Sequence, residues 1–217
     1  MSDVLHLLFE RKLAVVVQAP EREVLIARAL AAAQGGISIL ALPVSVPFVA
    51  EIAAEIADRA NVPVGLADVM DAEHVSIALA SGAEFVLSPV FDDELVKTCT
   101  DRGLAIVPSG ATPTEVARAR NVFKGPIAVH PAATLGGPAW LAYLGRLFPG
   151  VPLLASGAIG PDQAPHYLEM GAAAVIVDVG LFPTDMDPAS DEVIAVRASA
   201  LVEMCADAAP GLRASRP

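Results

Sequence analysis

Short apolar segments, rich in leucine and β-branched residues, recur along the chain at nearly regular intervals. They comprise residues 13–17, 37–40, 62–66, 84–87, 104–107, 126–129, 151–154 and 173–177. Most of these segments are apolar at successive positions instead of alternating with polar residues, as in parallel strands covered on both faces. The sequence therefore predicts eight buried parallel strands.

Amphipathic segments separate the predicted strands. In residues 22–33 and 46–57 the apolar side chains follow three- and four-residue steps, which predicts helices with one buried face. Thr112 before Pro113 is typical of a helix start, and the glycines expected to end helices are Gly35, Gly36, Gly82, Gly103 and Gly171. A second pattern, helix then glycine then strand, thus repeats along the chain.

The predicted strands begin roughly every 20 to 26 residues, which is close to the minimum for a strand followed by a helix. Eight such units predict a (β/α)8 TIM barrel forming one domain over residues 1–217, with an extra N-terminal helix in residues 1–11 and a frayed tail in residues 209–217. A doubly wound open sheet is the alternative. Residues 18–21 after the first strand lack the glycine-rich turn of dinucleotide-binding sheets, which favours the barrel.

Composition narrows the possible partners and locations. The formal net charge of −11 excludes a nucleic-acid binder that relies on a basic surface. An apolar fraction of 54% excludes disorder, yet no apolar run reaches the roughly 18 residues that span a membrane. The N-terminus lacks a positively charged signal region, and Cys99 and Cys205 show no paired spacing. We therefore expect a soluble cytoplasmic protein with two buried thiols.

TIM barrels carry their active sites at the C-terminal ends of the strands. The residues with polar side chains expected at this mouth are Gln18, Ser45, Asp68, Ser88, Ser109, Thr112, His130, Ser156 and Asp178. We expect a small-molecule ligand at this mouth.

Residues 85–97 and 103–116 resemble the fourth and fifth strands, with their following helices, of the 2-keto-3-deoxy-6-phosphogluconate and 4-hydroxy-2-oxoglutarate (KDPG/KHG) aldolases. The pattern and spacing match from about residue 7 to residue 182. Further matching pieces are residues 31–36, Ser88–Pro89, Pro108, Thr112, Pro131–Ala132 and Ser156–Gly157. The resemblance implies a TIM barrel, aldolase-type lyase chemistry and a homotrimer.

The resemblance also implies that residues central to aldolase chemistry are missing. The family's Schiff-base lysine on strand six falls on Ala128, and its proton-transferring glutamate on strand two falls on Ala41. Arginines of the family fall on Gln18 and Ser45. Imine chemistry is therefore not expected at the positions that the family uses for it.

Another lysine does not replace the missing one. The chain has three lysines, and Lys12, Lys97 and Lys124 lie before the first strand, in the fourth of the helices that follow strands, and before the sixth strand. A Schiff-base lysine must be desolvated at the barrel mouth, and none of the three is expected there.

The loops after strands seven and eight bind phosphate in the family, and both differ here. A Gly-Gly pair becomes Gly157–Ala158, and a Gly-Gly-Ser segment becomes Asp178–Gly180. A carboxylate at Asp178 would repel a phosphate dianion by about several kcal/mol at close range. We therefore expect an unphosphorylated substrate.

The residues that could ligate a metal do not form a known motif. Asp68, His130 and Asp178 are expected at the mouth. Three further candidates, Asp71, Glu73 and His74, are expected at the start of the third helix that follows a strand, and His166 is expected in the seventh. Three or four convergent ligands are needed. A metal site stays an alternative, and we expect neither a metal nor another cofactor.

Two functional hypotheses remain open. In the first, His130 is an acid/base that Asp68 and Asp178 orient, and the chain is an altered lyase or isomerase acting on a small keto or enol compound. Substrate hydrogen bonds would come from Gln18, Ser45, Ser88, Ser109, Thr112 and Ser156. In the second, the barrel is an inactive binding or assembly protein and His130 only fills the mouth. Small and polar groups at most strand ends favour the enzyme.

Overall fold

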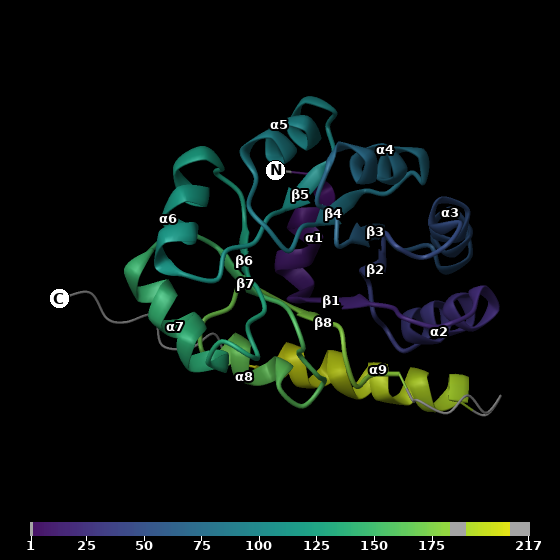
Figure 1. The fold of residues 1–217 in the computed structure, drawn as a ribbon. Coiled ribbons are helices and arrows are strands. Elements are labelled where there is room, and N and C mark those ends of the chain that lie inside the picture. Colours follow the sequence, from purple (N-terminus) through teal and green to yellow (C-terminus); the bar gives the residue numbers. More distant parts are fainter. Residues whose placement is uncertain (1, 183–189, 209–217) are drawn as a thin grey trace.

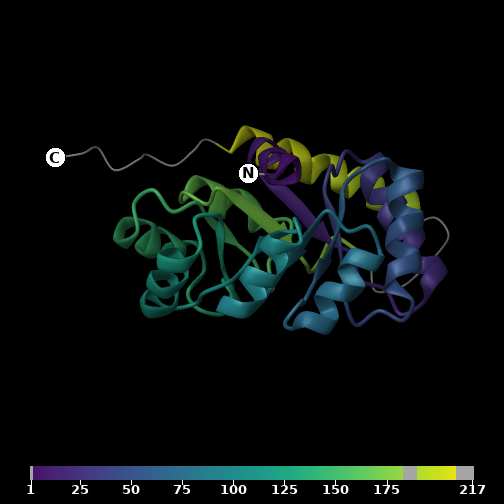
Figure 2. The same ribbon diagram turned by 90° about the horizontal axis from the view of Figure 1, so that it is seen from above.

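The computed structural model describes residues 2–182 and 190–208, and it shows a ring of parallel strands surrounded by helices (Figures 1 and 2). The strands are β1 (Leu13–Val16), β2 (Leu40–Pro43), β3 (Val64–Ala67), β4 (Phe85–Leu87), β5 (Ala105–Val107), β6 (Ile127–Val129), β7 (Leu153–Ala155) and β8 (Ala174–Val177). Their order is β5-β4-β3-β2-β1-β8-β7-β6. Strands that follow one another in the sequence are thus neighbours in space.

The ring closes between β5 and β6. A parallel bridge joins Ser109 to Ala128, and the backbone N–H of Ala128 donates to the carbonyl of Pro108 at 2.8 Å. The N–H of Gly110 donates to the carbonyl of Ala128 at 2.9 Å. The predicted TIM barrel is confirmed, and the open sheet is excluded.

Helices alternate with the strands, and all of them except the first lie around the outside of the barrel. They are α1 (Asp3–Arg11), α2 (Arg22–Gln34), α3 (Val49–Ala60), α4 (Ala72–Ala80), α5 (Asp93–Asp101), α6 (Pro113–Val122), α7 (Gly137–Leu147), α8 (Ala164–Glu169) and α9 (Ser190–Asp207). The expected extra N-terminal helix is α1. Gly36, Gly82, Gly103 and Gly171 follow helices with positive φ angles, as expected for helix ends.

Apolar side chains form two cores, one on each side of the strands. The outer core packs the outward-facing strand residues, such as Val15 and Leu42, against the surrounding helices. The inner core fills the barrel with mostly small side chains and includes Val4, Leu5 and Leu8 of α1. Helix α1 therefore closes the N-terminal end of the barrel, and it lies at the centre of the ring of strands in Figure 1.

One large side chain fills the inner core and requires a glycine beside it. The Phe85 side chain is only 1% exposed, and a Cβ atom on Gly65 would lie 2.6 Å from the Phe85 ring. A glycine inside strand β3 is thus explained by the close approach of this ring from strand β4.

Two element boundaries differ from the sequence prediction. The second strand is Leu40–Pro43 and not 37–40, because the N–H of Ile37 still donates to the carbonyl of Ala32 at the end of α2. Helix α3 begins at Val49 and not at residue 46, because Phe48 adopts a left-handed backbone with φ of 58°. The other strands differ from prediction by one or two residues at their ends.

Two further expectations concern the C-terminal tail and membrane-spanning segments. The predicted tail at residues 209–217 lies outside them. Within residues 2–182 and 190–208, no helix combines the length and the apolar character needed to cross a membrane.

Candidate active site

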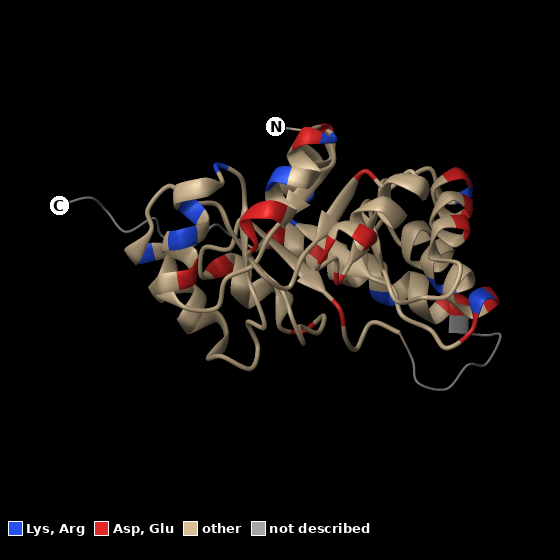
Figure 3. Cartoon of the chain, turned by 45° about the horizontal axis from the view of Figure 1, so that its top comes forward, with Lys and Arg blue, Asp and Glu red and all other residues tan. Residues whose placement is uncertain are grey.

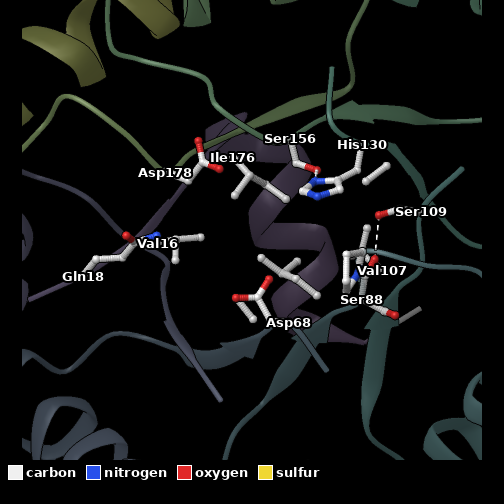
Figure 4. A pocket seen from close by; sticks show the side chains of 15 residues that line it. Val16, Gln18, Asp68, Ser88, Val107, Ser109, His130, Ser156, Ile176 and Asp178 are labelled. Carbon is white, nitrogen blue, oxygen red and sulfur yellow. Dashed lines mark hydrogen bonds between the residues drawn. The ribbon is translucent and has the colours of Figure 1, made fainter. Parts of the chain in front are cut away.

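A cavity of about 60 Å³ opens at the C-terminal ends of the barrel strands (Figure 4). Its apolar wall comes from strand residues whose side chains face the barrel interior, namely Val16, Ala67, Leu87, Val107, Ala128 and Ile176. Its polar wall comes from residues at or just after the strand ends, namely Gln18, Asp68, Ser88, Ser109, His130, Ser156 and Asp178. The cavity therefore has an apolar inner part and a polar mouth.

Seven of the nine residues proposed from the sequence line this cavity, and two do not. Ser45 is exposed in the turn after β2, outside the cavity lining. The Thr112 side chain accepts a hydrogen bond from the N–H of Glu115, and the Glu115 carboxylate accepts one from the N–H of Thr112. This reciprocal pair is a capping box that starts α6, so Thr112 has a structural role.

His130 and Ser156 form a side-chain pair across adjacent strand ends. The Nδ1 atom of His130 lies 3.1 Å from the Oγ atom of Ser156. We expected Asp68 and Asp178 to orient the His130 ring; the side chain within hydrogen-bonding distance of its Nδ1 is that of Ser156, and both carboxylates act on the ring through their charge. Ser156 directly follows β7, which is next to β6 in the barrel, and its hydroxyl therefore lies within hydrogen-bonding reach of the His130 ring.

Gly157 allows this pair to form, a role that the sequence reasoning did not assign to it. A Cβ atom at Gly157 would lie 2.6 Å from the Cα atom of Pro131 and 2.8 Å from Nδ1 of His130, and the φ angle of Gly157 is 93°. Any side chain there would displace the imidazole. The Ser-Gly pair after a strand was the signal that could have identified this residue.

The imidazole of His130 is kept neutral by its surroundings. Burial lowers the pKa of His130, and the negative charges of Asp178 and then Asp68 oppose this shift without reversing it. His130 therefore presents a neutral ring to a ligand at neutral pH.

Asp178 is bound to the backbone of the loop after β7. Its two carboxylate oxygens accept hydrogen bonds from the N–H groups of Ala158 at 3.0 Å and Ile159 at 2.8 Å. Ala158 itself has a positive φ of 58°, which turns these adjacent N–H groups toward the carboxylate. Backbone amides leave no signal in a sequence, so this arrangement could not be anticipated from residue types.

Asp68 also lies at the mouth, but it is more exposed than Asp178. It is exposed, follows β3 with a left-handed backbone of φ 61°, and lines the cavity. Aspartate adopts this backbone region more readily than most residues. In the part of the chain that the structure describes, the Asp68 carboxylate makes no ion pair with a lysine, arginine or histidine.

Two further serines line the side of the cavity opposite Asp178, as Figure 4 shows. The Ser109 hydroxyl donates to the backbone carbonyl of Ser88 at 2.6 Å. The Ser88 hydroxyl accepts a 3.4 Å hydrogen bond from the N–H of Val90. Both side chains are buried, so this polar wall is held in place by local backbone contacts.

The family model described as KDPG and KHG aldolase matches residues 5–196. The chain belongs to the KDPG and KHG aldolase family. It is 32% identical to the 2-dehydro-3-deoxy-phosphogluconate aldolase of Treponema pallidum (strain Nichols) over 155 residues, which is 71% of this chain and 73% of that protein.

Solved structures of KDPG and KHG aldolases have the same fold. The aldolase of Zymomonas mobilis ZM4 with 3-phosphoglycerate has a TM-score of 0.81 at 24% identity, covering 92% of this chain and 96% of that one. The aldolase of Legionella pneumophila, with pyruvate captured as a covalent carbinolamine intermediate, has a TM-score of 0.74 at 21% identity. That match covers 91% of this chain and 94% of the Legionella chain.

This member of the aldolase family has no lysine at its cavity. Lys12 follows α1 at the closed end of the barrel, where its Nζ atom lies 3.5 Å from the carbonyl of Ala208. Lys97 pairs with Asp101 on the surface of α5, and Lys124 donates to the carbonyl of Arg120. The side chain that lines the cavity from strand β6 is Ala128.

The described residues also contain no cluster of three or more histidine, cysteine, aspartate or glutamate side chains placed to hold a metal ion. His74 is engaged with its own helix start, where its Nδ1 atom accepts from the N–H of Met70 at 3.2 Å. His166 lies beside Glu169 on the exposed face of α8. These histidines are therefore committed to local contacts away from the cavity.

Proposed function

We propose that this aldolase-family barrel is a lyase- or isomerase-type enzyme that transfers a proton on a small keto or enol compound without forming an imine. The observation that carries the proposal is the cavity itself, because His130 and Asp68 line it and no lysine does. An acid/base pair at the C-terminal mouth of a TIM barrel is the usual arrangement for such chemistry.

His130 acts as a hydrogen-bond donor in this proposal. A serine hydroxyl has one hydrogen to donate, and Nδ1 of His130 is the side-chain partner of Ser156. We assign the donated hydrogen to Ser156, which leaves the proton of the neutral ring on Nε2. Nε2–H then donates to the carbonyl oxygen of the ligand and stabilises the negative charge that develops there.

Asp68 acts as the proton acceptor. Its carboxylate takes the proton from the carbon next to the carbonyl group, and the C–H electron pair becomes the C=C bond of an enolate. The oxygen of that enolate keeps its hydrogen bond to His130. Return of the proton from Asp68 to the same carbon restores the keto form, so the balanced cycle exchanges the hydrogen on the carbon next to the carbonyl group.

Asp178 acts as a positioning and selecting residue. Its carboxylate occupies the N–H groups of Ala158 and Ile159, and such adjacent N–H groups otherwise bind anions. A phosphate group placed there would find both N–H groups already bonded to Asp178 and would be repelled by the carboxylate charge. This supports an unphosphorylated substrate.

Hydrogen exchange tests the proposed activity. The wild-type protein should exchange the α-hydrogens of small three-carbon ketones with D2O, as followed by NMR, and His130→Gln and Asp68→Asn should each lower the rate about 100-fold or more. Ser45→Ala, an exposed side chain outside the cavity lining, is the control and should retain the rate. Binding without any exchange would instead support an inactive binding protein.

We also propose that the chain forms a homotrimer in the cytoplasm. Large apolar side chains at the surface support self-association, with Phe48 72% exposed and Val196 70% exposed. Cys99 and Cys205 are buried free thiols, which fits a reducing compartment. Sedimentation of a stable monomer at micromolar concentration would contradict the trimer.

A further inference from the structure

The charges around the cavity are of one sign. Among the described residues its charged lining consists of two carboxylates, Asp68 and Asp178, with no lysine or arginine. The described lysines and arginines lie instead on or next to the helices around the barrel (Figure 3). A ligand that enters the cavity therefore meets two carboxylates, while the Arg28 guanidinium lies outside the lining and donates to the backbone carbonyl of Gln18.

The two carboxylates are not equivalent toward a ligand. Asp178 is stabilised by two backbone N–H groups, from Ala158 and Ile159, so its negative charge has partners within the protein. Asp68 has neither a salt bridge nor a hydrogen bond to its carboxylate among the described residues. His130 is neutral and cannot act as its counter-charge. Asp68 is thus the group whose charge a ligand can compensate.

The remaining walls define where the other parts of a ligand would lie. The inner part of the cavity is apolar, with Val16, Leu87 and Ile176 among its side chains, and suits a methyl or methylene group. His130 offers a hydrogen-bond donor for a carbonyl oxygen. The cavity of about 60 Å³ has room for a few non-hydrogen atoms of a ligand.

We propose that Asp68 selects the ligand by charge, so that the cavity takes a small amino ketone, with its ammonium group at Asp68 and its carbonyl oxygen at His130, and rejects carboxylates. This inference rests on the function proposed above and names its substrate class. A carboxylate ligand would face Asp68 at short range, where like charges repel strongly in a partly desolvated site. An ammonium group would replace that repulsion by attraction.

Three ketones of nearly equal size separate the effect of charge from that of shape. Pyruvate, hydroxyacetone and aminoacetone each carry a methyl ketone on three carbons, with net charges of −1, 0 and +1 at pH 7. Their dissociation constants can be measured by NMR titration at low ionic strength, where charge effects are least screened. For the wild-type protein we expect aminoacetone to bind at least about tenfold more tightly than pyruvate, with hydroxyacetone between them.

Asp68→Asn tests whether this residue is responsible. The variant should bind aminoacetone at least about tenfold less tightly and pyruvate more tightly, with little change for hydroxyacetone. Glu73→Gln is the matched control, since it removes one negative charge from exposed Glu73 on α4, outside the cavity lining, and should leave the order unchanged. An equal effect of both variants would assign the preference to the net charge of −11 and overturn the proposal.

The result for binding is separate from the result for catalysis. Tighter binding of pyruvate than of aminoacetone to the wild type, or an unchanged ratio of their two dissociation constants in Asp68→Asn, would overturn the charge selection even if hydrogen exchange occurs. Selective binding of aminoacetone without hydrogen exchange would support the charge selection and contradict the proposed enzyme.

Discussion

The two ends of the barrel differ in how their inward-facing side chains are satisfied. At the N-terminal end, Val4, Leu5 and Leu8 of α1 pack into the inner core and are no more than 6% exposed. At the C-terminal end, polar side chains such as Asp68 and His130 surround an open cavity. The same eight strands supply both ends, so one end can contribute stability while the other keeps polar groups free for a ligand.

This division extends to the hydrogen bonds at the open end. Several polar groups there are held by short local contacts, as in the Asp178 carboxylate on the amides of Ala158 and Ile159. Such contacts fix the shape of the mouth without filling it. We expect substitutions at the closed end to lower stability most, and substitutions at the open end to have smaller effects on stability and to change binding and pH dependence.

The largest effect on stability is expected at the closed end. Leu8 is 1% exposed, and Leu8→Ala should lower the free energy of unfolding by about 2–5 kcal/mol, because it removes buried methyl groups and leaves a cavity. Urea denaturation measures this change. Glu10→Ala, at an exposed position of the same helix, should change stability by less than about 0.5 kcal/mol. Equal losses of unfolding free energy for the two variants would contradict the inference that α1 closes the N-terminal end of the barrel.

An intermediate effect is expected at Asp178. Asp178→Ala leaves the N–H groups of Ala158 and Ile159 without their carboxylate partner and should lower the free energy of unfolding by about 1–3 kcal/mol. The exposed N–H groups should then bind inorganic phosphate, so phosphate should raise the Tm of the variant more than that of the wild type.

Asp68→Ala is the control for Asp178→Ala. It removes the same charge and leaves the hydrogen bonds to Ala158 and Ile159 intact, so phosphate should raise its Tm little. An equal response of the two variants to phosphate would show that charge alone, and not the occupied amides, excludes the anion.

The smallest effect is the pH dependence that His130 adds to stability. Because burial lowers the pKa of His130 below the unfolded value of about 6.5, the unfolded state binds more protons in the interval between the two values. The contribution is fully present above about pH 6.5 and is lost as the pH falls through the folded pKa. Unfolding free energies of the wild type should therefore fall more steeply on acidification than those of His130→Gln.

The exposed His6 provides the comparison for this pH effect. His6→Gln should keep the wild-type slope of unfolding free energy against pH. A wild-type slope in His130→Gln as well would mean that His130 has the same pKa in the folded and unfolded states.

The barrel could be predicted from the sequence because its signals are local and repeated. Each strand has its own apolar run, and several helices end in a glycine. Because the same pattern recurs in successive βα units, each unit supports the assignment of the others. The second strand was misplaced because residues 37–44 are almost continuously apolar, and only pairing of Leu40 with Val64 decides where the ladder begins. The local sequence of residues 37–44 does not show which of these residues pairs with the neighbouring strand.

The candidate site could be predicted as a region but not as a set of contacts. Strand ends converge in any barrel, and this places Asp68, His130 and Asp178 around one cavity. Thr112 was expected both to start a helix and to bind the substrate; the capping box with Glu115 confirms the helix start, and Thr112 does not line the cavity. Asp178 was expected to orient His130, and the sequence did not indicate that its carboxylate also accepts two backbone N–H groups. Such short-range competition depends on side-chain direction, which residue spacing does not fix.

Borohydride reduction in the presence of pyruvate tests most directly whether this aldolase-family barrel works without an imine. Mass spectrometry of the wild-type protein should show Lys12, Lys97 and Lys124 unmodified, because none of them lines the cavity. The Legionella pneumophila aldolase, whose structure captures pyruvate as a covalent carbinolamine, serves as the positive control. A stoichiometric pyruvate adduct on any of the three lysines would contradict the account.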